Sequence, residues 1–425
     1  MSDYIDSYYS FSADTSTPYP QLNEDINADV CVLGGGFTGL SSALHLAKAG
    51  LSVVLVEANR IGFGATGRNG GQIVNSYSRD VDTVSQKYGQ QAGDALAAMM
   101  FEGGQIIRDL IEVDNIDCDY VRGGAFVAVN GKQMRELEHH QRLWEQHGNN
   151  AMQLHDQSSL GSIIKSQRYV GGLTDGLSGH IHPLKLALGE AKLITQLGGR
   201  IFEQSPVTKV ETGETTIVHT PNGKIRAKFM VVAGNAYLSH VMPELTKKSM
   251  PCGTQIVTTE VLGEELCQQL IPQNHCIEDC NYLLDYFRIT ADQRLLYGGG
   301  VVYGGRDPKD IERLVRPKLE KTFPQLKGIK IDFAWTGNFL LTLSRLPEFG
   351  RLGHNIYYMQ GYSGHGVTCT HLAGKLVAEA IKGQASRFDA FSQLPHLPLF
   401  GGRALQIPFT ALGASYYNLR DQLGI

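Results

Sequence analysis

The chain has 425 residues, of which 42% are hydrophobic and 19% are charged, and 38 basic against 42 acidic side chains give a formal charge of −4. This composition excludes an intrinsically disordered chain, and the near-neutral balance offers no broad basic field for nucleic acid. Glycine occurs 49 times, where about 30 would be usual. A folded protein must place this surplus where the backbone bends sharply or approaches something closely.

The N-terminal segment lacks the basic start and the apolar stretch of a secretory signal, and no run reaches the roughly 18 apolar residues of a membrane helix. Seven cysteines, mostly in apolar or mixed stretches, are typical of reduced thiols in a cytoplasmic protein. Cys276 and Cys280 have no second pair of thiols nearby, which predicts no metal site. We therefore expect a cytoplasmic protein without a membrane span, a bound metal or a nucleic-acid partner.

The first folded elements are short and closely spaced. Residues 1–27 read as an arm, and an apolar strand over 29–33 then leads into a glycine turn over 34–39. A helix with apolar positions at helical spacing follows, and a second apolar strand covers 51–56. Strand, glycine turn, helix and strand within about 30 residues predict a parallel βαβ unit.

The glycine turn of this unit has the pattern G-x-G-x-x-G at Gly34, Gly36 and Gly39. Its glycines permit a tight turn, a close approach to a pyrophosphate and close helix packing, while the helix N-terminus offers N–H groups to the phosphates. Glu57 ends the second strand, where a carboxylate can accept hydrogen bonds from a ribose. The unit predicts dinucleotide binding; the alternative is an ordinary glycine-rich loop with a surface glutamate.

Three further segments favour FAD over a nicotinamide cofactor. They are the glycine-rich loop 61–71, the strand end 231–234 with its small residues, and the turn 361–366, which opens a late helix. Each alone is compatible with an ordinary tight turn, but together they are typical of FAD enzymes. We expect the turns at 34–39 and 361–366 to meet at one FAD.

The remaining elements alternate between helices and strands. From about 246 to 335 the pattern turns antiparallel, with a hairpin that joins 281–288 to 294–300. We also predict a polar hairpin at 221–223, a strand over 355–360, and helices over 133–146, from Pro183 to Gly198, over 367–381 and near 414–423.

At this point the chain resembles a known family. The G-x-G-x-x-G turn, the segment GATGRNGG at 64–71 and the turn GYSGHGV at 361–367 resemble the D-amino acid oxidase superfamily of FAD-dependent amine and amino-acid oxidases. Longer strings from nearly the whole chain, such as MPCGTQIVTTE and WTGNFLLTLSRLPEFGRL, are similar to its members that oxidise gamma-glutamylputrescine. This resemblance implies that FAD takes a hydride from the carbon bearing the terminal amine and that oxygen reoxidises the flavin. The products would be an aldehyde, ammonia and hydrogen peroxide.

One departure from the superfamily pattern concerns the substrate. Members that act on amino acids commonly read Trp-x-Gly-Leu-Arg-Pro, and the arginine can clamp the substrate carboxylate. Here Phe339 stands where that arginine would, and Ser344 replaces a later aspartate. An amine substrate is therefore favoured. The same stretch has no cysteine where some relatives bond the flavin, so we expect non-covalent FAD.

The resemblance implies an α/β fold, in which a Rossmann-like FAD-binding domain with a parallel sheet carries an inserted, mainly antiparallel substrate domain. We assign 28–80, 165–245 and 336–400 to the FAD-binding domain. The substrate domain would comprise 81–164 and 246–335, and 401–425 would form a C-terminal extension.

Four residues are candidates for direct roles in substrate binding or catalysis. His365 lies inside the late glycine turn, and we expect it near the flavin rather than in the core. Tyr286 and Trp335 can wall an amine pocket, although ordinary core packing explains them equally well. Arg288 either meets the distant glutamyl carboxylate or makes a structural salt bridge. His180-Ile181-His182 lacks a third ligand and reads as structural.

The glycine-rich segments and their neighbours are the expected FAD contacts. The expected contacts are Gly34, Gly36, Phe37, Thr38, Gly39, Glu57, Ala65, Thr66, Gly67, Arg68, Gly70, Gly71, Gln72, Val207, Ala233, Gly234, Gly361, Ser363, Gly364, His365, Gly366 and Val367.

Two other functions also fit the sequence. One is a dehydrogenase that passes electrons from another amine or amino acid to a quinone, and the other is a flavin-binding scaffold without turnover.

Overall fold

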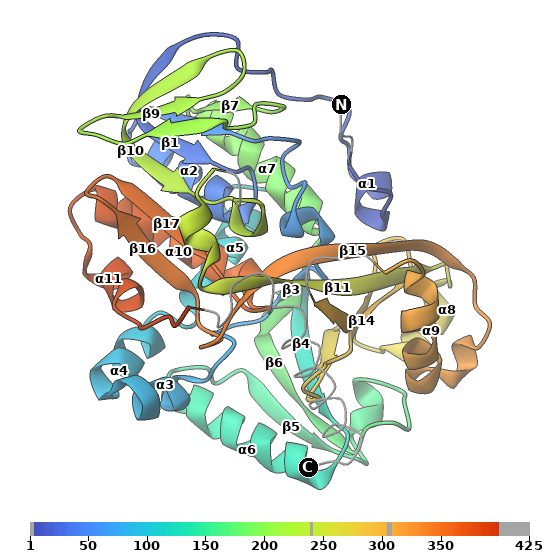
Figure 1. Cartoon of the computed structure of the whole chain (residues 1–425). Coiled ribbons are helices and arrows are strands. Elements are labelled where there is room, and N and C mark those ends of the chain that lie inside the picture. The colour runs from blue at the N-terminus through green and yellow to red at the C-terminus, as the bar shows by residue number, and fades with distance from the viewer. Residues whose placement is uncertain (1–3, 239–240, 304–307, 399–425) are drawn as a thin grey trace.

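A computed structural model of the chain describes residues 4–238, 241–303 and 308–398, with only the backbone of 301–303. Within these residues the strands form two sheets, one of eight strands and one of nine, with helices packed around them (Figure 1). The α/β class predicted from the sequence is confirmed. The helix predicted near 414–423 and the extension 401–425 lie outside the described residues.

The first sheet is built on parallel strands. Neighbouring strands follow the order β16-β17-β10-β1-β2-β7, and β8 and β9 extend it from β10. Its pairs β17–β10, β10–β1, β1–β2 and β2–β7 are all parallel. The strands are β1 (Ile26–Leu33), β2 (Val53–Val56), β7 (Arg200–Phe202), β8 (Lys209–Glu211), β9 (Thr216–His219), β10 (Lys224–Val232), β16 (Glu348–Leu352) and β17 (Ile356–Gln360).

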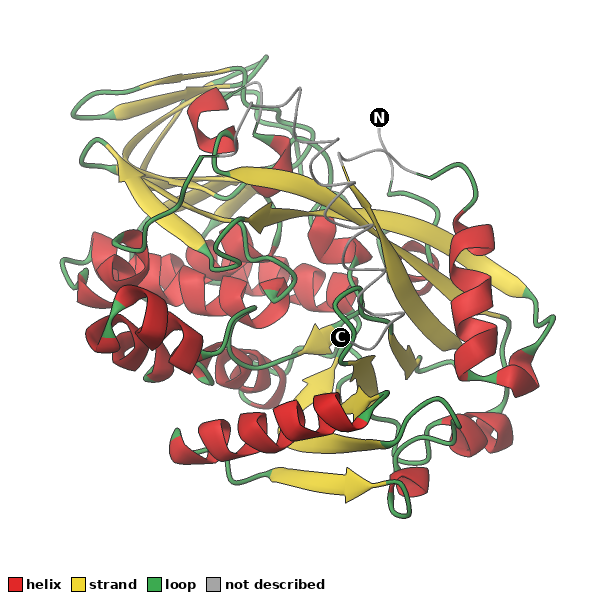
Figure 2. Cartoon of the chain, turned by 60° about the horizontal axis from the view of Figure 1, so that its bottom comes forward, coloured by secondary structure: helices red, strands yellow, loops and turns green. Residues whose placement is uncertain are grey.

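Both faces of this sheet are covered, as a parallel sheet requires. Along β1, Val30 and Val32 belong to the large core under the helices, whereas Cys31 and Leu33 belong to a second core on the opposite face. Figure 2 shows the helices gathered in a layer on one side of the sheet. Three of them are α2 (Phe37–Lys48), α7 (Pro183–Gln196) and α10 (Gly366–Ile381). The predicted βαβ unit and the predicted late helix are thus confirmed.

The second sheet is mainly antiparallel. Its order is β15-β11-β14-β13-β12-β4-β6-β3, with β5 paired to β6. The pair β4–β12 is parallel, and the predicted hairpin is present as β13–β14. The strands are β3 (Gln72–Ile73), β4 (Val121–Ala128), β5 (Met152–Asp156), β6 (Gly171–His180), β11 (Ser249–Thr259), β12 (Cys276–Asp279), β13 (Tyr286–Ile289), β14 (Leu295–Tyr303) and β15 (Ile331–Thr342).

Eight further α-helices complete the described part of the chain. The long helix α6 lies beside β5 at the lower edge of the molecule in Figure 1, and α8 and α9 lie at the far end of the second sheet. The other helices are α1 (Tyr8–Ser12), α3 (Val81–Tyr88), α4 (Gln90–Ala97), α5 (Glu102–Glu112), α6 (Gly131–Gln146), α8 (Glu264–Leu270), α9 (Ile311–Thr322) and α11 (Ser386–Ser392).

Sheet membership differs in places from the expected domain ranges. Strands β3 and β6 fall within 28–80 and 165–245, which we assigned to the FAD-binding part, yet both pair within the second sheet. Strand β15 crosses the expected border at 335–336. Two-residue β3 is too short for a sequence signal, and β6 is placed by its pairing with β4, some fifty residues earlier. The division into two domains stays a prediction.

The expected N-terminal arm contains a helix that packs against the second sheet. Tyr8 and Tyr9 of α1 are buried in a cluster with Tyr286 and Trp335. The Tyr9 hydroxyl donates to the Asn69 carbonyl at 2.7 Å. The arm thus supports the glycine-rich loop from behind.

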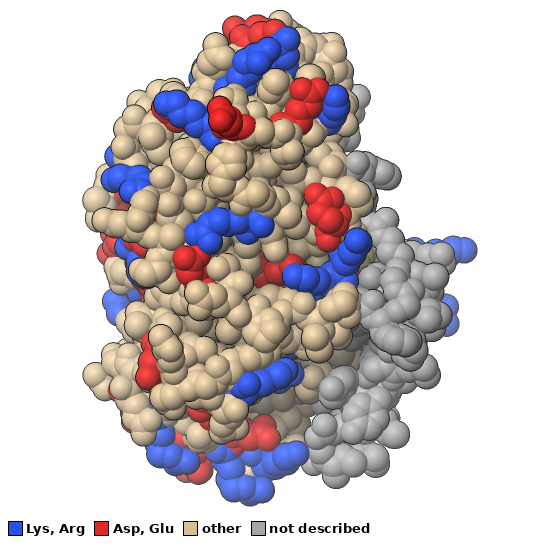
Figure 3. All heavy atoms as spheres, turned by 60° about the vertical axis from the view of Figure 1, so that its left-hand side comes forward, with Lys and Arg blue, Asp and Glu red and all other residues tan. Residues whose placement is uncertain are grey.

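The distribution of surface charge and the state of the cysteines can be compared with the composition. On the face in Figure 3, basic and acidic side chains are interspersed rather than gathered by sign. All seven cysteines are in the described part of the chain and are free, and six of them are buried. Among the helices of the described residues, none has the length and apolar character needed to cross a membrane.

Helices α2 and α10 approach each other closely, and this approach depends on Gly374. A Cβ built at Gly374 would lie 2.5 Å from the backbone carbonyl carbon of Ser41. This is closer than real Cβ atoms come. The two helices can therefore touch because position 374 has no side chain.

Gly374→Ala should lower the free energy of unfolding by about 1–3 kcal/mol, because the added methyl group overpacks this interface. Helix propensity alone would favour alanine by about 1 kcal/mol, so the sign of the change decides between the two effects. Gly131→Ala is the matched control, since Gly131 starts α6 and a Cβ there meets only the end of the Arg135 side chain at 3.8 Å. Urea unfolding checks both variants; equal stabilisation by both would contradict the account.

Candidate functional site

A cavity of about 730 Å³ lies where the carboxyl ends of the parallel strands face the second sheet. The N-terminal ends of α2 and α10 both open into it. Most of the expected FAD contacts line this cavity: Gly34, Gly36, Phe37, Thr38, Glu57, Ala65, Thr66, Arg68, Gly70, Gln72, Val207, Ala233, Gly234, Ser363, Gly364, His365, Gly366 and Val367. The other expected contacts, Gly39, Gly67, Gly71 and Gly361, are not among the residues that line it.

The N-terminus of α2 is shaped by glycines. Gly34 has a φ of +109°, which favours glycine, and a Cβ there would lie 2.7 Å from the Ala233 carbonyl oxygen. A Cβ at Gly39 would overlap the Gly34 carbonyl oxygen. The backbone N–H of Phe37 donates to Thr66 Oγ1 at 2.9 Å. The positive end of α2 is thus held at the cavity surface, where a phosphate would be stabilised.

Glu57 faces the cavity from the end of β2. Its Oε2 accepts the Gly35 N–H at 2.7 Å, and its Oε1 accepts the Asn59 N–H at 2.8 Å. Burial raises the pKa of the Glu57 carboxyl, and these two N–H donors act in the opposite direction. Each carboxylate oxygen can accept a further hydrogen bond, so both remain suitable acceptors for ribose hydroxyls.

The loop over 61–71 forms a rigid part of the wall. The Arg68 guanidinium lies over the Phe63 ring at 4.7 Å, and its Nε donates to the Phe63 carbonyl at 2.8 Å. Trp335 Nε1 donates to the Arg68 carbonyl at 3.0 Å. The Asn69 side-chain amide donates to the Thr66 carbonyl at 2.7 Å. Trp335, a side chain of the second sheet, therefore helps to fix a loop that follows a strand of the first sheet.

The two distant glycine turns meet, as predicted. Thr38 Oγ1 and the Tyr362 hydroxyl form a buried hydrogen bond of 2.9 Å between residues 324 positions apart. Ser363 and Gly364 have φ values of 55° and +103°, and this left-handed backbone turns the chain into α10. Residues of both turns line one cavity.

His365 and Tyr286 line the same cavity. Burial lowers the pKa of His365 to about 4, so the imidazole is neutral at pH 7. The Tyr286 hydroxyl lies 3.1 Å from Thr254 Oγ1, and burial raises its pKa above the usual range. Both side chains therefore present uncharged polar groups to a ligand.

Arg288 and Trp335, for which we expected direct roles, do not line the cavity. Arg288 Nε donates to the Gly70 carbonyl at 2.7 Å, and its Nη2 donates to the Tyr9 hydroxyl and to the Ile181 carbonyl at 3.1 Å each. Its buried guanidinium therefore holds the arm and the loop together. Trp335 is buried behind the loop in the same way. Both side chains have structural contacts here, Arg288 through hydrogen bonds rather than the expected salt bridge, and their direct roles stay predictions.

The histidines of the string 180–182 also have structural partners. His180 Nε2 lies 3.0 Å from the Asn274 carbonyl, and His182 Nδ1 accepts the Lys185 N–H at the start of α7. No group of three side chains suited to a metal occurs in the described part of the chain.

Several cavity residues were not predicted. The additional lining residues include Glu278, Cys280, Asn281, Tyr282, Leu284 and Arg345. Glu278 comes to the cavity because β12 pairs with β4, which is about 150 residues earlier. Arg345 has a φ of 64°. An arginine in the sequence does not predict this left-handed turn conformation. Hydrophobic periodicity carries no signal for either residue.

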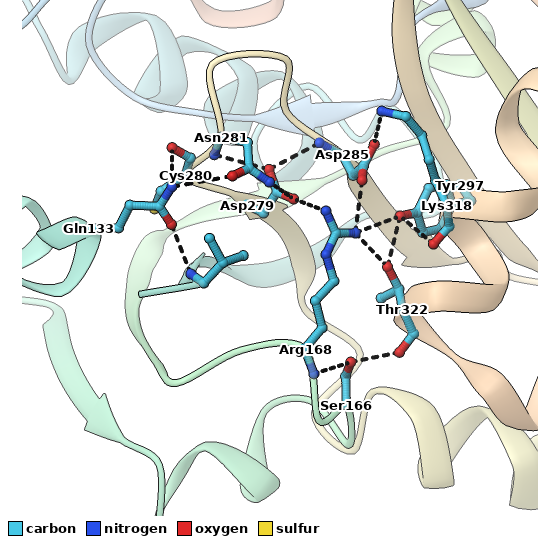
Figure 4. Close-up of polar contacts among 11 residues, drawn as sticks. Gln133, Ser166, Arg168, Asp279, Cys280, Asn281, Asp285, Tyr297, Lys318 and Thr322 are labelled. Atoms are coloured by element: carbon cyan, nitrogen blue, oxygen red, sulfur yellow. Dashed lines mark hydrogen bonds and ion pairs between the residues drawn. The ribbon is translucent and has the colours of Figure 1, made fainter. Parts of the chain in front are cut away.

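A buried ion network holds both ends of the segment 280–284 (Figure 4). Arg168 contacts Asp279 Oδ2 at 3.0 Å and Asp285 Oδ2 at 2.8 Å. Lys318 Nζ contacts Asp285 Oδ1 at 2.8 Å. The Asn281 side-chain amide donates to Asp279 at 2.8 Å. One arginine thus fixes the two aspartates that flank a wall of the cavity.

The site fits a dinucleotide that ends in a larger ring system. The glycine-shaped end of α2 suits a pyrophosphate, and Glu57 suits a ribose. The cavity continues from there past the loop 61–71 to Tyr286 and the N-terminus of α10. Its volume of about 730 Å³ is within the range of roughly 300–1,000 Å³ for ligand pockets.

Comparison with known proteins decides the family. A family model described as "DAO: FAD dependent oxidoreductase" matches residues 29–380. The chain belongs to this family. This FAD-dependent oxidoreductase is 61% identical over 426 aligned residues to "Gamma-glutamylputrescine oxidoreductase" of Escherichia coli K12, and the match covers 100% of both chains.

Solved structures share the fold of this oxidoreductase. Glycine oxidase from Geobacillus kaustophilus has a TM-score of 0.72 at 19% identity and covers 88% of this chain and 100% of its own. L-proline dehydrogenase from P. horikoshii has a TM-score of 0.73 at 20% identity and covers 85% and 95%. At these identities the likeness concerns the fold alone.

Arg168→Met should lower the free energy of unfolding by about 3–5 kcal/mol, because it leaves Asp279 and Asp285 buried with less compensating charge. Arg316→Met is the matched control. Arg316 pairs with Glu312 and Glu320 on the surface of α9, so its loss should cost less than about 1 kcal/mol. Urea unfolding of the two holoproteins checks the difference, and similar losses in both would contradict a structural role for the network.

Proposed function

We propose that the enzyme oxidises the terminal primary amine of gamma-glutamylputrescine to the aldehyde and releases ammonia and hydrogen peroxide, as a step of putrescine breakdown in the cytoplasm. The observation that carries the proposal is the 61% identity, over the whole of both chains, to an oxidoreductase named for that substrate. A cavity with an acidic end and a basic side chain, described below, supports it.

The residues of the cavity suit an amine with an aliphatic chain. Tyr286, Phe339 and Leu340 line it and offer apolar surface to methylene groups. The resemblance places Phe339 where members that act on amino acids commonly carry an arginine, so that position supplies no guanidinium for a substrate carboxylate. Uncharged Tyr286 and His365 can orient the substrate without competing for its charge.

FAD, when bound without a covalent link, would accept the hydride that leaves the carbon bearing the amine. The α2 end and Glu57 would hold its pyrophosphate and ribose, and the N-terminal end of α10 would stabilise negative charge near the ring. The protein's own contribution is to orient the C–H bond and to exclude water from it.

The distant glutamyl carboxylate requires a cation, and Arg345 is our candidate in place of Arg288. Arg345 is half-buried, lines the cavity and lies over the Tyr282 ring at 5.6 Å. In the described part of the chain no carboxylate is within ion-pair distance of it. Arg79 also lines the cavity but is exposed.

Mixing the purified holoenzyme with gamma-glutamylputrescine in the absence of oxygen should bleach the flavin. Admitting air should then regenerate it and give peroxide and ammonia in equal amounts. Absorbance of the flavin and assays of the two products check this.

The other outcomes separate the alternatives. Bleaching by this substrate without reoxidation by air would indicate a dehydrogenase that needs a quinone. A flavin that no amine or amino acid bleaches would indicate a scaffold without turnover. Release of the flavin by acid precipitation should show that it is not covalently linked.

Arg345→Met should raise the KM for gamma-glutamylputrescine by on the order of 10-fold or more, because a charge-assisted contact of about 1.5–3 kcal/mol is lost. The KM for N-acetylputrescine, which has no carboxylate, should change little. Arg79→Met is the control with the same loss of charge at an exposed position. If both substrates lose equally, Arg345 acts on the cavity shape and not on the carboxylate.

A further inference from the structure

Among the described residues, a carboxylate that lines the cavity has no cationic partner. Glu278 lines the cavity, and Gln72 Nε2 donates a hydrogen bond to its Oε2 over 3.4 Å. Within the described ranges no lysine, arginine or histidine is at ion-pair distance from Glu278. A charged group that is removed from water without a partner is unfavourable, so a cationic ligand is the natural complement.

Strand alternation explains why Glu278 is separated from the nearby cations. On β12, Ile277 packs in a core with Phe287, and Asp279 pairs with Arg168 on that same side of the strand (Figure 4). Successive side chains point to opposite faces of a strand, so Glu278 points into the cavity. Arg168 and Lys318 are engaged by Asp279 and Asp285.

The position of Glu278 is well supported by the sheet. It pairs with Tyr286 on β13 and with Phe126 on β4. Tyr286 in turn lies against Gly70, where a Cβ would be 2.7 Å from its ring. Glu278, Tyr286 and Gln72 thus form one corner of the cavity, next to the loop expected to hold the flavin.

We propose that Glu278 binds the terminal ammonium group of the substrate and accepts one proton from it. This rests on the proposed function, in which the substrate is a primary amine. An aliphatic amine with a pKa near 10.4 reaches the site protonated at pH 7. One N–H bond breaks, one O–H bond forms on Glu278, and the electron pair stays on nitrogen, so nothing is oxidised or reduced. That electron pair is needed when the neighbouring carbon loses a hydride.

The titration of Glu278 suits this step. Burial, and then the Asp279 charge, raise the pKa of the Glu278 carboxyl to about 7. The other titratable groups around it are Cys276, Cys280 and Tyr286, and burial raises the pKa of each well above neutral. Below pH 7 the carboxyl is protonated and cannot take the ammonium, so substrate capture should fall as the pH falls.

Glu278→Gln tests the proposal in the holoenzyme. At pH 7 the second-order rate constant for flavin reduction by gamma-glutamylputrescine, measured at low substrate concentration, should fall by on the order of 10- to 100-fold. The affinity for gamma-glutamylbutylamide, which keeps the glutamyl group but lacks the terminal amine, should change less than about threefold. The fall in the flavin reduction rate below about pH 7 should disappear. The rate should instead rise as the pH approaches the pKa of the free amine. Glu278→Asp keeps the carboxylate and should restore part of the rate.

Glu348→Gln is the matched control. Glu348 is a buried carboxylate whose pKa burial also raises, and it does not line the cavity. A retained preference for the amine over the butylamide in Glu278→Gln, or an unchanged fall in the flavin reduction rate below about pH 7, would overturn the proposal.

Misfolding and failure of the proposed function can both be recognised. The folded state raises the pKa of Glu278, so its stability contribution is full below about pH 4.5 and is lost as the pH rises through 7. Glu278→Gln should therefore be at least as stable as the wild type at pH 8. If gamma-glutamylputrescine does not reduce the wild-type flavin, the proposed function fails. The affinity difference between the two ligands still measures the role of Glu278.

Discussion

The close contact between α2 and α10 is the constraint on which the site depends. Both helices start at glycine turns beyond the carboxyl ends of parallel strands, and both direct their N-terminal ends at one cavity. Gly374 lets the helices touch at Ser41, and the hydrogen bond between Thr38 and Tyr362 ties the two turns together. A larger side chain at 374 would move one positive helix end away from the other. The rest of the cavity is built around this pair.

The second sheet provides the walls that the parallel sheet lacks. Buried hydrogen-bond donors from it, Arg288 and Trp335, hold the backbone of the loop 61–71. On the other side, Arg168 holds the two aspartates that bracket the segment 280–284. In both places buried donors hold the cavity walls, while two charged side chains that line the cavity, Glu278 and Arg345, have no oppositely charged partner within the described residues.

Much of the cavity around the start of α2 could be predicted because its determinants are local. The glycines at 34, 36 and 39 and Glu57 lie within one βαβ unit, so their arrangement follows from spacing in the sequence. Arg288 was harder, because alternation along a strand predicts which face a side chain takes but not which partner it meets. Its partners Tyr9, Gly70 and Ile181 come from three distant segments. Glu278 depends on a parallel pairing with β4, and Arg345 on a left-handed turn, and neither leaves a pattern in the sequence.

The most direct test is a crystal structure of the holoenzyme soaked with gamma-glutamylbutylamide. The account predicts the pyrophosphate of FAD at the N-terminal end of α2 and the ribose hydroxyls on Glu57. The alkyl end of the ligand should point at Glu278, and its carboxylate should lie by Arg345. A flavin outside the cavity between the two sheets, or a ligand bound with its carboxylate at Glu278, would contradict it.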